Sequence, residues 1–457
     1  MSCEEIFRAL ENARSLFFVG IGGISMSSIA FVFHSKGYAV RGSDRAQNDM
    51  TKKLCGSGIE VFHGHSAENI IGADAVIYTG AVNEENPELK EAKKLGLPII
   101  YRADALAYLM KKYKTRIGIS GSHGKSTCTS MISHILISCG KDPTVMCGAQ
   151  TAEMDGAYRV GKGDDFVFEA CEYKDSFLEF FPSVSVILNI DLDHTDYFTN
   201  GIEQIKSSFR KYALLAFDSA EPLVISCADD ENSASALDGI EKTTFGIEND
   251  ADYTAKNIVY NDGCAEFDIF KHGEYFCHVK LSVLGKHNVY NALAACAVCN
   301  HAGVTPHEIA ERLADFEGLS RRFEKKGSVN GADVYIDYAH HPKELVASID
   351  AAKKMSKGRV ICAFEPHTYS RTASLFDDFA RSFDKADKTF FVDIYAAREV
   401  NTFGVSSKML ADAVYGGEYA GSYDIAAQKI REMAQKDDIV LILGAGTVNE
   451  IADILVN

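Results

Sequence analysis

One segment of this chain, TRIGISGSHGKSTCTSMISHIL at residues 115–136, limits the possible folds more than any other. An apolar run that favours a strand is followed by a glycine turn and then by a helical pattern. Glycine accepts the φ values of such a turn, so backbone N–H groups can point inward, and the helix adds its positive N-terminal end. We therefore predict a phosphate-binding loop lined by Gly121, Ser122, His123, Gly124, Lys125, Ser126 and Thr127.

The last residues of this loop have different expected tasks. Lys125 is placed to reach the β- and γ-phosphates of a nucleoside triphosphate, and Ser126 offers a hydroxyl to Mg²⁺. The usual pattern has glycine six residues before the lysine, where this chain has Ile119. A glycine turn that arose by chance is the alternative, and the strand before the loop and the helix after it argue against that alternative.

Length and charge exclude several classes of protein. A chain of 457 residues is too long for one core and predicts about three domains. The net charge of −17 argues against a nucleic-acid surface, although a local group of cations can still bind a small anion. No apolar run approaches the roughly 20 residues of a membrane span, and the N-terminal segment shows no secretory signal. Twelve scattered cysteines are typical of buried thiols in a reducing compartment, so we expect a cytoplasmic protein without membrane insertion.

The first segment, residues 1–112, has the pattern of a small α/β domain. A strand at 16–19 leads into a second glycine turn, and a strand at 38–41 leads into Ser43 and Asp44. An acidic residue about 20 positions after a glycine turn lets a carboxylate meet ribose hydroxyls in nucleotide-binding βαβ units. Taken alone, this arrangement predicts a dinucleotide such as NAD.

The second segment, residues 113–318, is predicted to carry two further strands that end in polar residues. The strand at 165–172 delivers Glu169 and Glu172, and the strand at 184–193 delivers Asp191, Asp193 and His194. Open parallel sheets bind ligands at the carboxyl ends of their strands, so we expect these side chains near the phosphate loop. The third segment, 319–457, alternates strands at 334–337, 360–364, 389–394 and 439–443 with helices, which predicts another doubly wound α/β unit.

Taken together, these motifs resemble those of the Mur ligases, the ATP-dependent enzymes that form amide bonds in peptidoglycan precursor synthesis. The resemblance covers essentially the whole chain. It rests on GIGGISMSSIA and GSD in the first segment, on SGSHGKST, EACEYKDSFL, NIDLDH and GKHNVYNALAA in the second, and on LSRRFE, DYAHHP, FEPHTYSRT and DIYAARE in the third. It implies an α/β fold of three domains: an N-terminal Rossmann-like domain, a central P-loop ATPase-like domain with a mostly parallel sheet, and a C-terminal Rossmann-like domain.

The resemblance also implies a reaction. The motifs are most similar to those of the branch in which the carboxylate of UDP-N-acetylmuramate attacks the γ-phosphate of ATP, and the amine of L-alanine then displaces phosphate from the acyl phosphate. Lys125, Glu172 and His194 are the implied catalytic residues, and Ser126, Glu172 and His194 are the implied Mg²⁺ ligands. Glu169 is the alternative carboxylate, and an orienting role is the alternative for His194.

The remaining site residues follow from the same resemblance. ATP is implied to contact Asn291, Arg322 and Asp337, and the C-terminal domain is expected to close over it. The UDP-sugar cradle is implied to comprise Gly20, Gly22, Gly23, Ser25, Met26, Ser43 and Asp44. The amino-acid pocket is implied to comprise Tyr338, His340, His367 and Arg371, with Arg371 on the alanine carboxylate. Thr368 is a departure, because many relatives have arginine there.

Two other readings compete with this one. A related ligase that attaches a recycled tripeptide to the same UDP-sugar has a similar layout, but the first glycine loop and the PHTYSR stretch are closer to the alanine branch. A dinucleotide-dependent oxidoreductase would explain the segment from Gly20 to Asp44, but it leaves the phosphate loop without a task. We expect only small-molecule partners and a monomer or weak homodimer.

Overall fold

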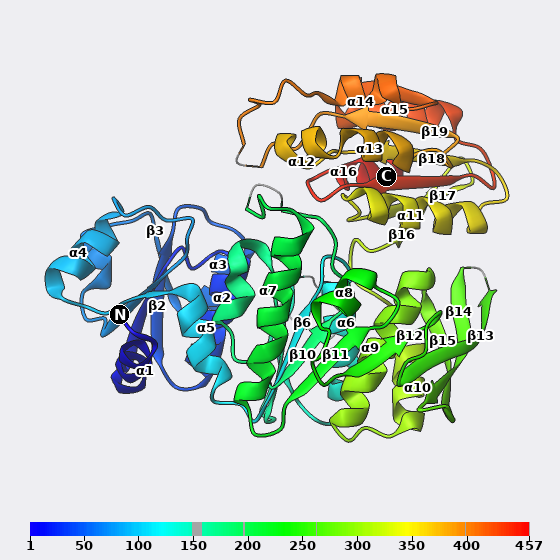
Figure 1. Cartoon of the computed structure of the whole chain (residues 1–457). Coiled ribbons are helices and arrows are strands. Elements are labelled where there is room, and N and C mark those ends of the chain that lie inside the picture. The colour runs from blue at the N-terminus through cyan, green and yellow to red at the C-terminus, as the bar shows by residue number, and fades with distance from the viewer. Residues whose placement is uncertain (149–157, 195–196, 262, 398, 457) are drawn as a thin grey trace. The chain divides into compact units, whose positions relative to one another are not determined.

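The computed structural model describes residues 1–148, 158–194, 197–261, 263–397 and 399–456. The chain divides into two compact units, and each is described by itself. Unit 1 comprises residues 1–254, 270–274 and 290–312, and unit 2 comprises 255–269, 275–289 and 313–457. Three β-sheets flanked by helices run through these units (Figure 1), so the predicted α/β class is confirmed. The predicted domain boundaries after residues 112 and 318 stay predictions.

The N-terminal sheet is parallel and has five strands. Its elements are α1 (Cys3–Asn12), β1 (Ser15–Val19), α2 (Ile24–Ser35), β2 (Ala39–Asp44), α3 (Asp49–Gly56), β3 (Glu60–His63), η1 (Ala67–Ile70), β4 (Ala75–Tyr78), α4 (Pro87–Leu95), β5 (Ile99–Tyr101) and α5 (Arg102–Met110). The strand order is β3-β2-β1-β4-β5, so the order changes direction at β1. A crevice for a ligand forms at such a switch point, and the first glycine loop directly follows β1.

The central sheet has ten strands in the order β15-β14-β13-β12-β11-β10-β6-β9-β7-β8. Its elements are β6 (Thr115–Ser120), α6 (Lys125–Ser138), β7 (Thr144–Met146), β8 (Tyr158–Arg159), β9 (Asp165–Glu169), η2 (Tyr173–Glu179), β10 (Val184–Ile187), α7 (Ile202–Leu214), η3 (Leu215–Asp218), β11 (Leu223–Cys227), α8 (Glu231–Ala236), β12 (Thr243–Gly246), β13 (Tyr253–Asn261), β14 (Cys264–Lys271), β15 (Glu274–Leu284), α9 (Lys286–His301) and α10 (Pro306–Ala314). The strand of the phosphate loop, β6, pairs in parallel with both β10 and β9. Gly118 in β6 is required by packing, because a Cβ there would collide with Tyr212 and Phe168.

Two strands of this sheet are shorter than the sequence predicts. β9 ends at Glu169 and β10 ends at Ile187, whereas the apolar runs extend to residues 172 and 193. After Ile187 one more bond joins the chain to β6, from the Leu188 N–H to the Ser120 carbonyl at 3.0 Å, and the next residue, Asn189, accepts the Ser122 N–H of the phosphate loop at 3.1 Å. The polar residues that follow both strands therefore lie on loops at the carboxyl edge of the sheet.

The C-terminal sheet has six strands in the order β16-β17-β21-β18-β19-β20. Its elements are β16 (Glu324–Val329), β17 (Ala332–Asp337), α11 (Pro342–Met355), β18 (Val360–Phe364), α12 (Tyr369–Ser374), α13 (Phe376–Ser382), β19 (Lys388–Val392), α14 (Ser407–Ala413), β20 (Gly417–Gly421), α15 (Tyr423–Met433), β21 (Ile439–Leu443) and α16 (Glu450–Val456). The edge strand β16 pairs antiparallel with its neighbour, and the other four pairings of the sheet are parallel. Separate apolar clusters cover the two faces of this sheet, as a parallel sheet requires.

Two further findings bear on the sequence predictions. None of the helices in the described part of the chain combines the length and the apolar composition that crossing a bilayer requires. All twelve cysteines are free thiols. Cys296 and Cys299, which are separated by two residues in α9, are both buried.

Candidate active site

The phosphate loop connects β6 to α6 through two glycines in conformations that other residues rarely adopt. Gly121 has φ +146° and Gly124, the N-cap of α6, has φ +82°. Lys125, Ser126 and Thr127 form the first turn of α6, where no carbonyl of the helix itself can accept their N–H groups. This helix end can therefore offer several N–H donors and a positive dipole to an anion.

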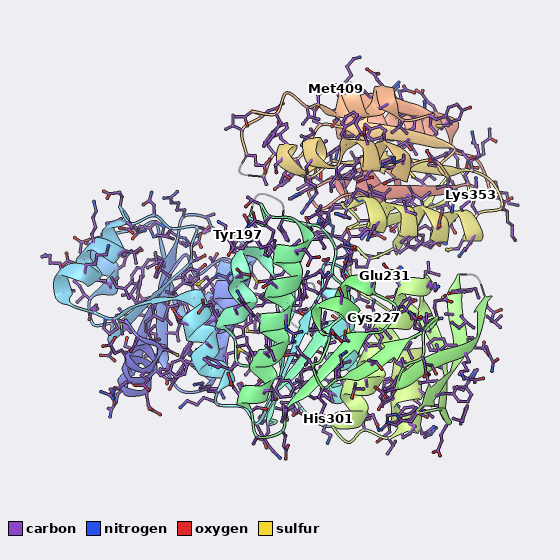
Figure 2. All side chains as sticks on the ribbon, viewed as in Figure 1. Tyr197, Cys227, Glu231, His301, Lys353 and Met409 are labelled. Atoms are coloured by element: carbon purple, nitrogen blue, oxygen red, sulfur yellow. The ribbon has the colours of Figure 1, made fainter. Side chains whose placement is uncertain are left out.

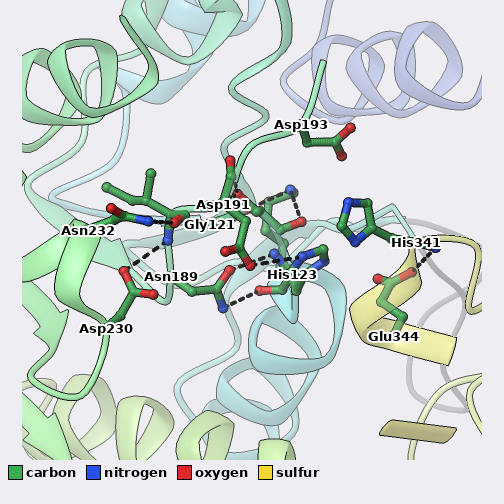
Figure 3. Close-up of polar contacts among 12 residues, drawn as sticks. Gly121, His123, Asn189, Asp191, Asp193, Asp230, Asn232, His341 and Glu344 are labelled. Atoms are coloured by element: carbon green, nitrogen blue, oxygen red, sulfur yellow. Dashed lines mark hydrogen bonds and ion pairs between the residues drawn. The ribbon is translucent and has the colours of Figure 1, made fainter. Parts of the chain in front are cut away.

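The first half of the loop is held by the segment that follows β10 (Figure 3). Asn189 accepts the His123 N–H at its Oδ1 (2.8 Å) and the Ser122 N–H at its carbonyl (3.1 Å). Its Nδ2 donates to the His123 carbonyl at 3.1 Å. The N–H groups of Ser122 and His123 thus bond to Asn189. The sequence had predicted that the N–H groups of the loop point inward, where they would meet a phosphate. The predicted donors for a phosphate are therefore the N–H groups at the start of α6.

Three of the predicted catalytic side chains lie together beside this loop. The Nζ of Lys125 is 3.2 and 3.1 Å from the two carboxylate oxygens of Glu172, and it also donates to the Gly121 carbonyl at 2.5 Å. The Nε2 of His194 is 3.6 Å from Glu172 Oε1. Glu172 is almost fully buried, with 3% of its side chain exposed, so the cation beside it is essential to its charge.

The two partners of this ion pair shift each other's pKa. Burial would raise the pKa of Glu172, but the Lys125 ammonium and the hydrogen bond from His194 outweigh it and hold the pKa below its usual value. Burial would lower the pKa of Lys125, but the Glu172 carboxylate outweighs it and raises the pKa. The site thus keeps a charged lysine ready for a phosphate and a charged carboxylate ready for a cation.

Glu169, the alternative carboxylate, has other partners. Its Oε1 accepts the Gly148 N–H at 2.6 Å and the Cys147 thiol at 3.1 Å. Glu172 is brought to Lys125 because the chain turns away from the sheet after β9 and starts η2 with Glu172 as its N-cap. This geometry supports the choice of Glu172 over Glu169, and the roles of both stay predictions.

Asn291, the predicted adenine contact, lies on α9 directly against the N-cap of α6. A Cβ built at Gly124 would be 2.7 Å from Asn291 Oδ1, so glycine is needed for space as well as for its positive φ. The neighbouring Asn288 lies inside α9, which begins at Lys286, and its Nδ2 donates to the Leu284 carbonyl at 2.8 Å.

We expect Gly124→Ala to weaken nucleotide binding at least about tenfold and to destabilise the fold by about 1–3 kcal/mol. The reason is that the new methyl group must displace Asn291 at a strained backbone position. Gly140→Ala is the matched control, because Gly140 also has positive φ (+74°) and its Cβ would meet no atom within 4 Å. Titration calorimetry with ATP and urea unfolding measure both effects. Equal affinity in the two variants would contradict the prediction.

The first glycine loop is tied to the end of β2. The Gly20 and Ile21 N–H groups donate to the Ser43 carbonyl at 2.8 and 3.0 Å, and the Gly22 N–H donates to Asp44 Oδ2 at 2.9 Å. The predicted cradle residues Gly20, Gly22, Gly23, Ser43 and Asp44 are therefore brought together. The Asp44 carboxylate also accepts the Ala46 N–H at 3.2 Å, so it shapes the loop in addition to any contact with a ligand.

Other predicted cradle residues are engaged inside the protein. The Ser43 hydroxyl is fully buried and donates to Glu88 Oε2 at 2.7 Å, and His65 Nδ1 is 2.8 Å from the same oxygen. Met26 is buried in the core, and the Ser25 hydroxyl accepts from Arg102 at 3.0 Å. Of these residues, Ser43 and Met26 can serve the cradle only through their backbone or by shaping it.

The predicted site residues of the third segment gather at the carboxyl edge of the C-terminal sheet. Asp337 ends β17, is buried, and accepts the Ser348 hydroxyl at 2.8 Å and the Ala339 N–H at 2.9 Å. Burial raises its pKa even though the nearby Arg322 guanidinium opposes the shift. Arg322 lies over the Tyr338 ring, 5.1 Å from the ring centroid, and 3.8 Å from Glu344.

His340 and His367 form a pair of largely buried imidazoles, with ring centroids 5.8 Å apart. Burial lowers the pKa of His340 to about 4; Glu344 opposes this shift and the Arg371 guanidinium adds to it. Burial and the same Arg371 also lower the pKa of His367. His340 is therefore neutral, with Nδ1–H donating to the Tyr338 carbonyl at 2.9 Å, which leaves Nε2 with its lone pair.

The low pKa of His340 predicts a pH dependence of stability. In the unfolded chain the imidazole binds a proton below about pH 6.5, whereas in the folded chain it does so only below about pH 4. The stability that depends on neutral His340 is thus present above pH 6.5 and lost as the pH falls toward 4. His340→Gln should reduce the loss across this window by about 1–3 kcal/mol in urea unfolding. His307→Gln, at an exposed position, is the control, and parallel profiles of the wild type and His340→Gln would contradict the prediction.

Sequence reasoning missed several residues of the site. Asn189 begins the NIDLDH motif, and its position after an apolar run was the available signal. Arg321 lies in the LSRRFE motif beside the predicted Arg322, and it donates to the Gly444 and Gly446 carbonyls at 3.1 and 2.7 Å. Glu88, which is joined to Ser43 across 45 residues, had no such signal. Such contacts depend on the tertiary fold alone.

Comparison with known proteins gives a consistent result over the whole chain. Three family models match in succession: "Mur ligase family, catalytic domain" at residues 16–114, "Mur ligase middle domain" at 119–299, and "Mur ligase, glutamate ligase domain" at 321–446. The UDP-N-acetylmuramate–L-alanine ligase of Caldanaerobacter subterraneus subsp. tengcongensis is 46% identical over 451 residues, 97% of each chain.

Two solved structures extend the comparison. The UDP-N-acetylmuramate–alanine ligase of Thermotoga maritima superposes with a TM-score of 0.79 at 29% identity, over 97% of this chain and 98% of that one. A murein peptide ligase from Psychrobacter arcticus superposes with a TM-score of 0.70 at 22% identity, over 97% and 98%. The second match shows the shared fold alone.

Proposed function

The chain belongs to the Mur ligase family, and from this premise we propose that it joins L-alanine to the carboxylate of UDP-N-acetylmuramate. It is an ATP-dependent ligase that forms an amide bond. The observation that carries the choice of substrates is the 46% identity to an L-alanine ligase along 97% of both chains. The first glycine loop and the PHTYSR stretch, which are closer to the alanine branch, disfavour the tripeptide substrate. Oxidoreductase activity would not explain why Lys125 and Glu172 lie together beside the phosphate loop.

The chemistry requires two anions to react, so the site must neutralise negative charge. Lys125 and the N–H groups that begin α6 are the donors placed for the γ-phosphate. When the phosphate arrives, it competes with Glu172 for the Lys125 ammonium. We propose that Lys125 then turns from Glu172 to the phosphate, where it stabilises the charge that develops as the carboxylate of the sugar attacks.

The residues beside Lys125 also fit Mg²⁺. Mg²⁺ prefers oxygen ligands and is commonly bound by one or two carboxylates together with substrate phosphates. Glu172 supplies a buried carboxylate, Ser126 a hydroxyl, and His194 an imidazole within 3.6 Å of Glu172. Among the described residues no group of three or more His, Cys, Asp or Glu side chains forms a ready metal site, which suits an ion that gains ligands from ATP. Bound there, Mg²⁺ would polarise the phosphate oxygens.

The other predicted regions complete the proposal. The loop from Gly20 to Gly23 would hold the UDP diphosphate, and the Arg371 guanidinium would bind the alanine carboxylate. Closure of the C-terminal domain would keep water from the acyl phosphate. We further propose that the protein acts in the cytoplasm, which its free thiols support, and on small molecules only, in keeping with its net charge of −17. A monomer or weak homodimer stays a prediction.

The proposal is tested by ADP release from purified protein with ATP, Mg²⁺ and UDP-N-acetylmuramate. L-Alanine is compared with glycine, L-serine and the tripeptide in parallel reactions. We expect the highest kcat/KM with L-alanine and ADP in equal amount to the amide product. Turnover that responds to the tripeptide but not to L-alanine would favour the tripeptide ligase hypothesis. No turnover with any amine would refute both the L-alanine and the tripeptide hypotheses.

Removal of divalent cations is expected to abolish ADP release. Chelation with EDTA should lower the rate at least about 10²-fold, because the Lys125 ammonium and the N–H groups that begin α6 cannot by themselves offset the negative charge of ATP and the sugar carboxylate. Added Mg²⁺ in excess of EDTA should restore the rate fully, which shows that the chelator did not damage the fold. Unchanged activity in EDTA would contradict the proposed Mg²⁺ site.

A further inference from the structure

Two neighbouring carboxylates, Asp229 and Asp230, occupy the turn between β11 and α8. Cys227, the last residue of β11, and Glu231, the first residue of α8, mark the two ends of this turn in Figure 2. β11 lies between β10 and β12, and β10 pairs with the phosphate-loop strand β6. The turn is therefore at the same edge of the central sheet as the phosphate loop.

Asp230 holds the segment that clamps the phosphate loop. Its Oδ1 caps α8 by accepting the Ser233 N–H at 2.7 Å and also accepts the Ile190 N–H at 3.1 Å (Figure 3). Asn232 donates to the Ile190 carbonyl at 2.8 Å, so the backbone of Ile190 is held on both sides. Asn189, the next residue back along the chain, is the one that grips Ser122 and His123 of the loop.

Asp229 holds the helix on the other side of the loop. Its Oδ2 accepts the Ile247 and Glu248 N–H groups at 2.6 and 2.9 Å, and its Oδ1 accepts the Asn249 N–H at 2.7 Å. The same Oδ2 accepts the Tyr290 hydroxyl at 2.9 Å. Tyr290 immediately precedes Asn291 on α9, whose side chain lies against Gly124 at the start of α6.

We infer that Asp229 and Asp230 are positioning residues for the nucleotide site: without touching ATP, they set the distance between the phosphate loop and the α9 residue that faces it. The inference rests on the proposed function, because it presumes that ATP binds at this loop. Both carboxylates are fixed in place by N–H and O–H donors of the protein. The N–H groups of residues 247–249 hold the pKa of Asp229 below its usual value despite burial, so Asp229 stays a charged acceptor.

The test compares variants that lose one or two hydrogen bonds of these carboxylates with matched controls. Tyr290→Phe keeps the ring and removes only the hydroxyl that reaches Asp229, and Asp230→Ala removes both bonds of Oδ1. Asp230→Asn is the matched control, because an amide oxygen can accept the same two N–H groups and caps a helix equally well. Ser406→Ala, which removes the cap of α14, controls for the loss of a helix cap elsewhere.

The Kd for ATP with Mg²⁺, measured by calorimetry, should rise about three- to tenfold in Tyr290→Phe and in Asp230→Ala, the effect of about one hydrogen bond. Asp230→Asn and Ser406→Ala should stay within about twofold of wild type. The KM for ATP should rise in the same variants while the KM for UDP-N-acetylmuramate does not, a split that a general loss of stability would not give. If Asp230→Ala does not fold, Tyr290→Phe carries the test.

The outcomes separate the two ideas. Wild-type affinity for ATP in both Tyr290→Phe and Asp230→Ala would overturn the positioning role and leave the proposed function intact. Absence of ATP binding by the wild-type protein itself would instead overturn the proposed function. A rise confined to the variants that lose a contact, with both controls near wild type, supports the inference.

Discussion

Lys125→Ala is expected to lower the rate of ADP formation by at least about 10²–10³-fold, the cost of removing one preorganised donor from a developing negative charge. Lys125 is the cation that the structure places beside the phosphate loop, with its Nζ 2.5 Å from the Gly121 carbonyl and 3.1 Å from Glu172. ADP release with saturating ATP, UDP-N-acetylmuramate and L-alanine measures the effect, and the loss should be in kcat.

The buried ion pair of Lys125 and Glu172 predicts that this variant also affects the fold. Removing Lys125 leaves the buried Glu172 carboxylate without its cation, so Lys125→Ala should lose stability as well as activity. Lys94→Ala is the matched control, since it deletes a lysine from an exposed pair with Glu91 at 3.0 Å and should change neither property measurably. Wild-type turnover by folded Lys125→Ala protein would show that ATP does not bind at this loop.

The sequence predicted the parts of the site that depend on local pattern. The order of β6, the loop and α6 follows from an apolar run, two glycines that adopt positive φ, and a helical period, all within 22 residues. The strands Val360–Phe364 and Ile439–Leu443 were predicted with correct bounds, because each is a short, fully apolar run in a sheet that is covered on both faces.

The sequence did not predict contacts between residues far apart in the chain. Asn189 reaches His123 across 66 positions, Asp229 reaches Tyr290 across 61, and nothing in the local pattern of either residue indicates its partner. The lengths of β9 and β10 were overestimated for the same reason. Beyond each strand a single further backbone bond reaches β6, from Ala170 after β9 and from Leu188 after β10. The residues that then follow β10 bond to Ser122 of the phosphate loop instead of to a neighbouring strand.

Lys125 and Glu172 each serve both the fold and the proposed chemistry. A loss of activity on substitution therefore does not by itself show which of the two roles was lost. A buried ion pair that loses one partner is typically destabilised by about 3–5 kcal/mol, since an uncompensated charge stays buried. Replacing both partners by apolar residues of similar volume is often neutral or stabilising. A double variant therefore separates the two roles: its stability should recover if the pair serves the fold, and its activity should stay lost if the pair serves the chemistry.

We expect Glu172→Leu alone to lower the free energy of unfolding by about 3–5 kcal/mol and to abolish ADP release, because it leaves Lys125 buried and removes the proposed Mg²⁺ ligand. The double variant Lys125→Met/Glu172→Leu should recover most of the lost stability, because no buried charge remains. It should stay as inactive as Lys125→Ala, because it lacks both the Lys125 ammonium proposed for the phosphate and the Glu172 carboxylate proposed for the cation. Urea unfolding without nucleotide and ADP release measure the two properties on the same preparations. A double variant as unstable as Glu172→Leu would mean that the ion pair does not account for the loss, and an active double variant would remove both residues from the mechanism.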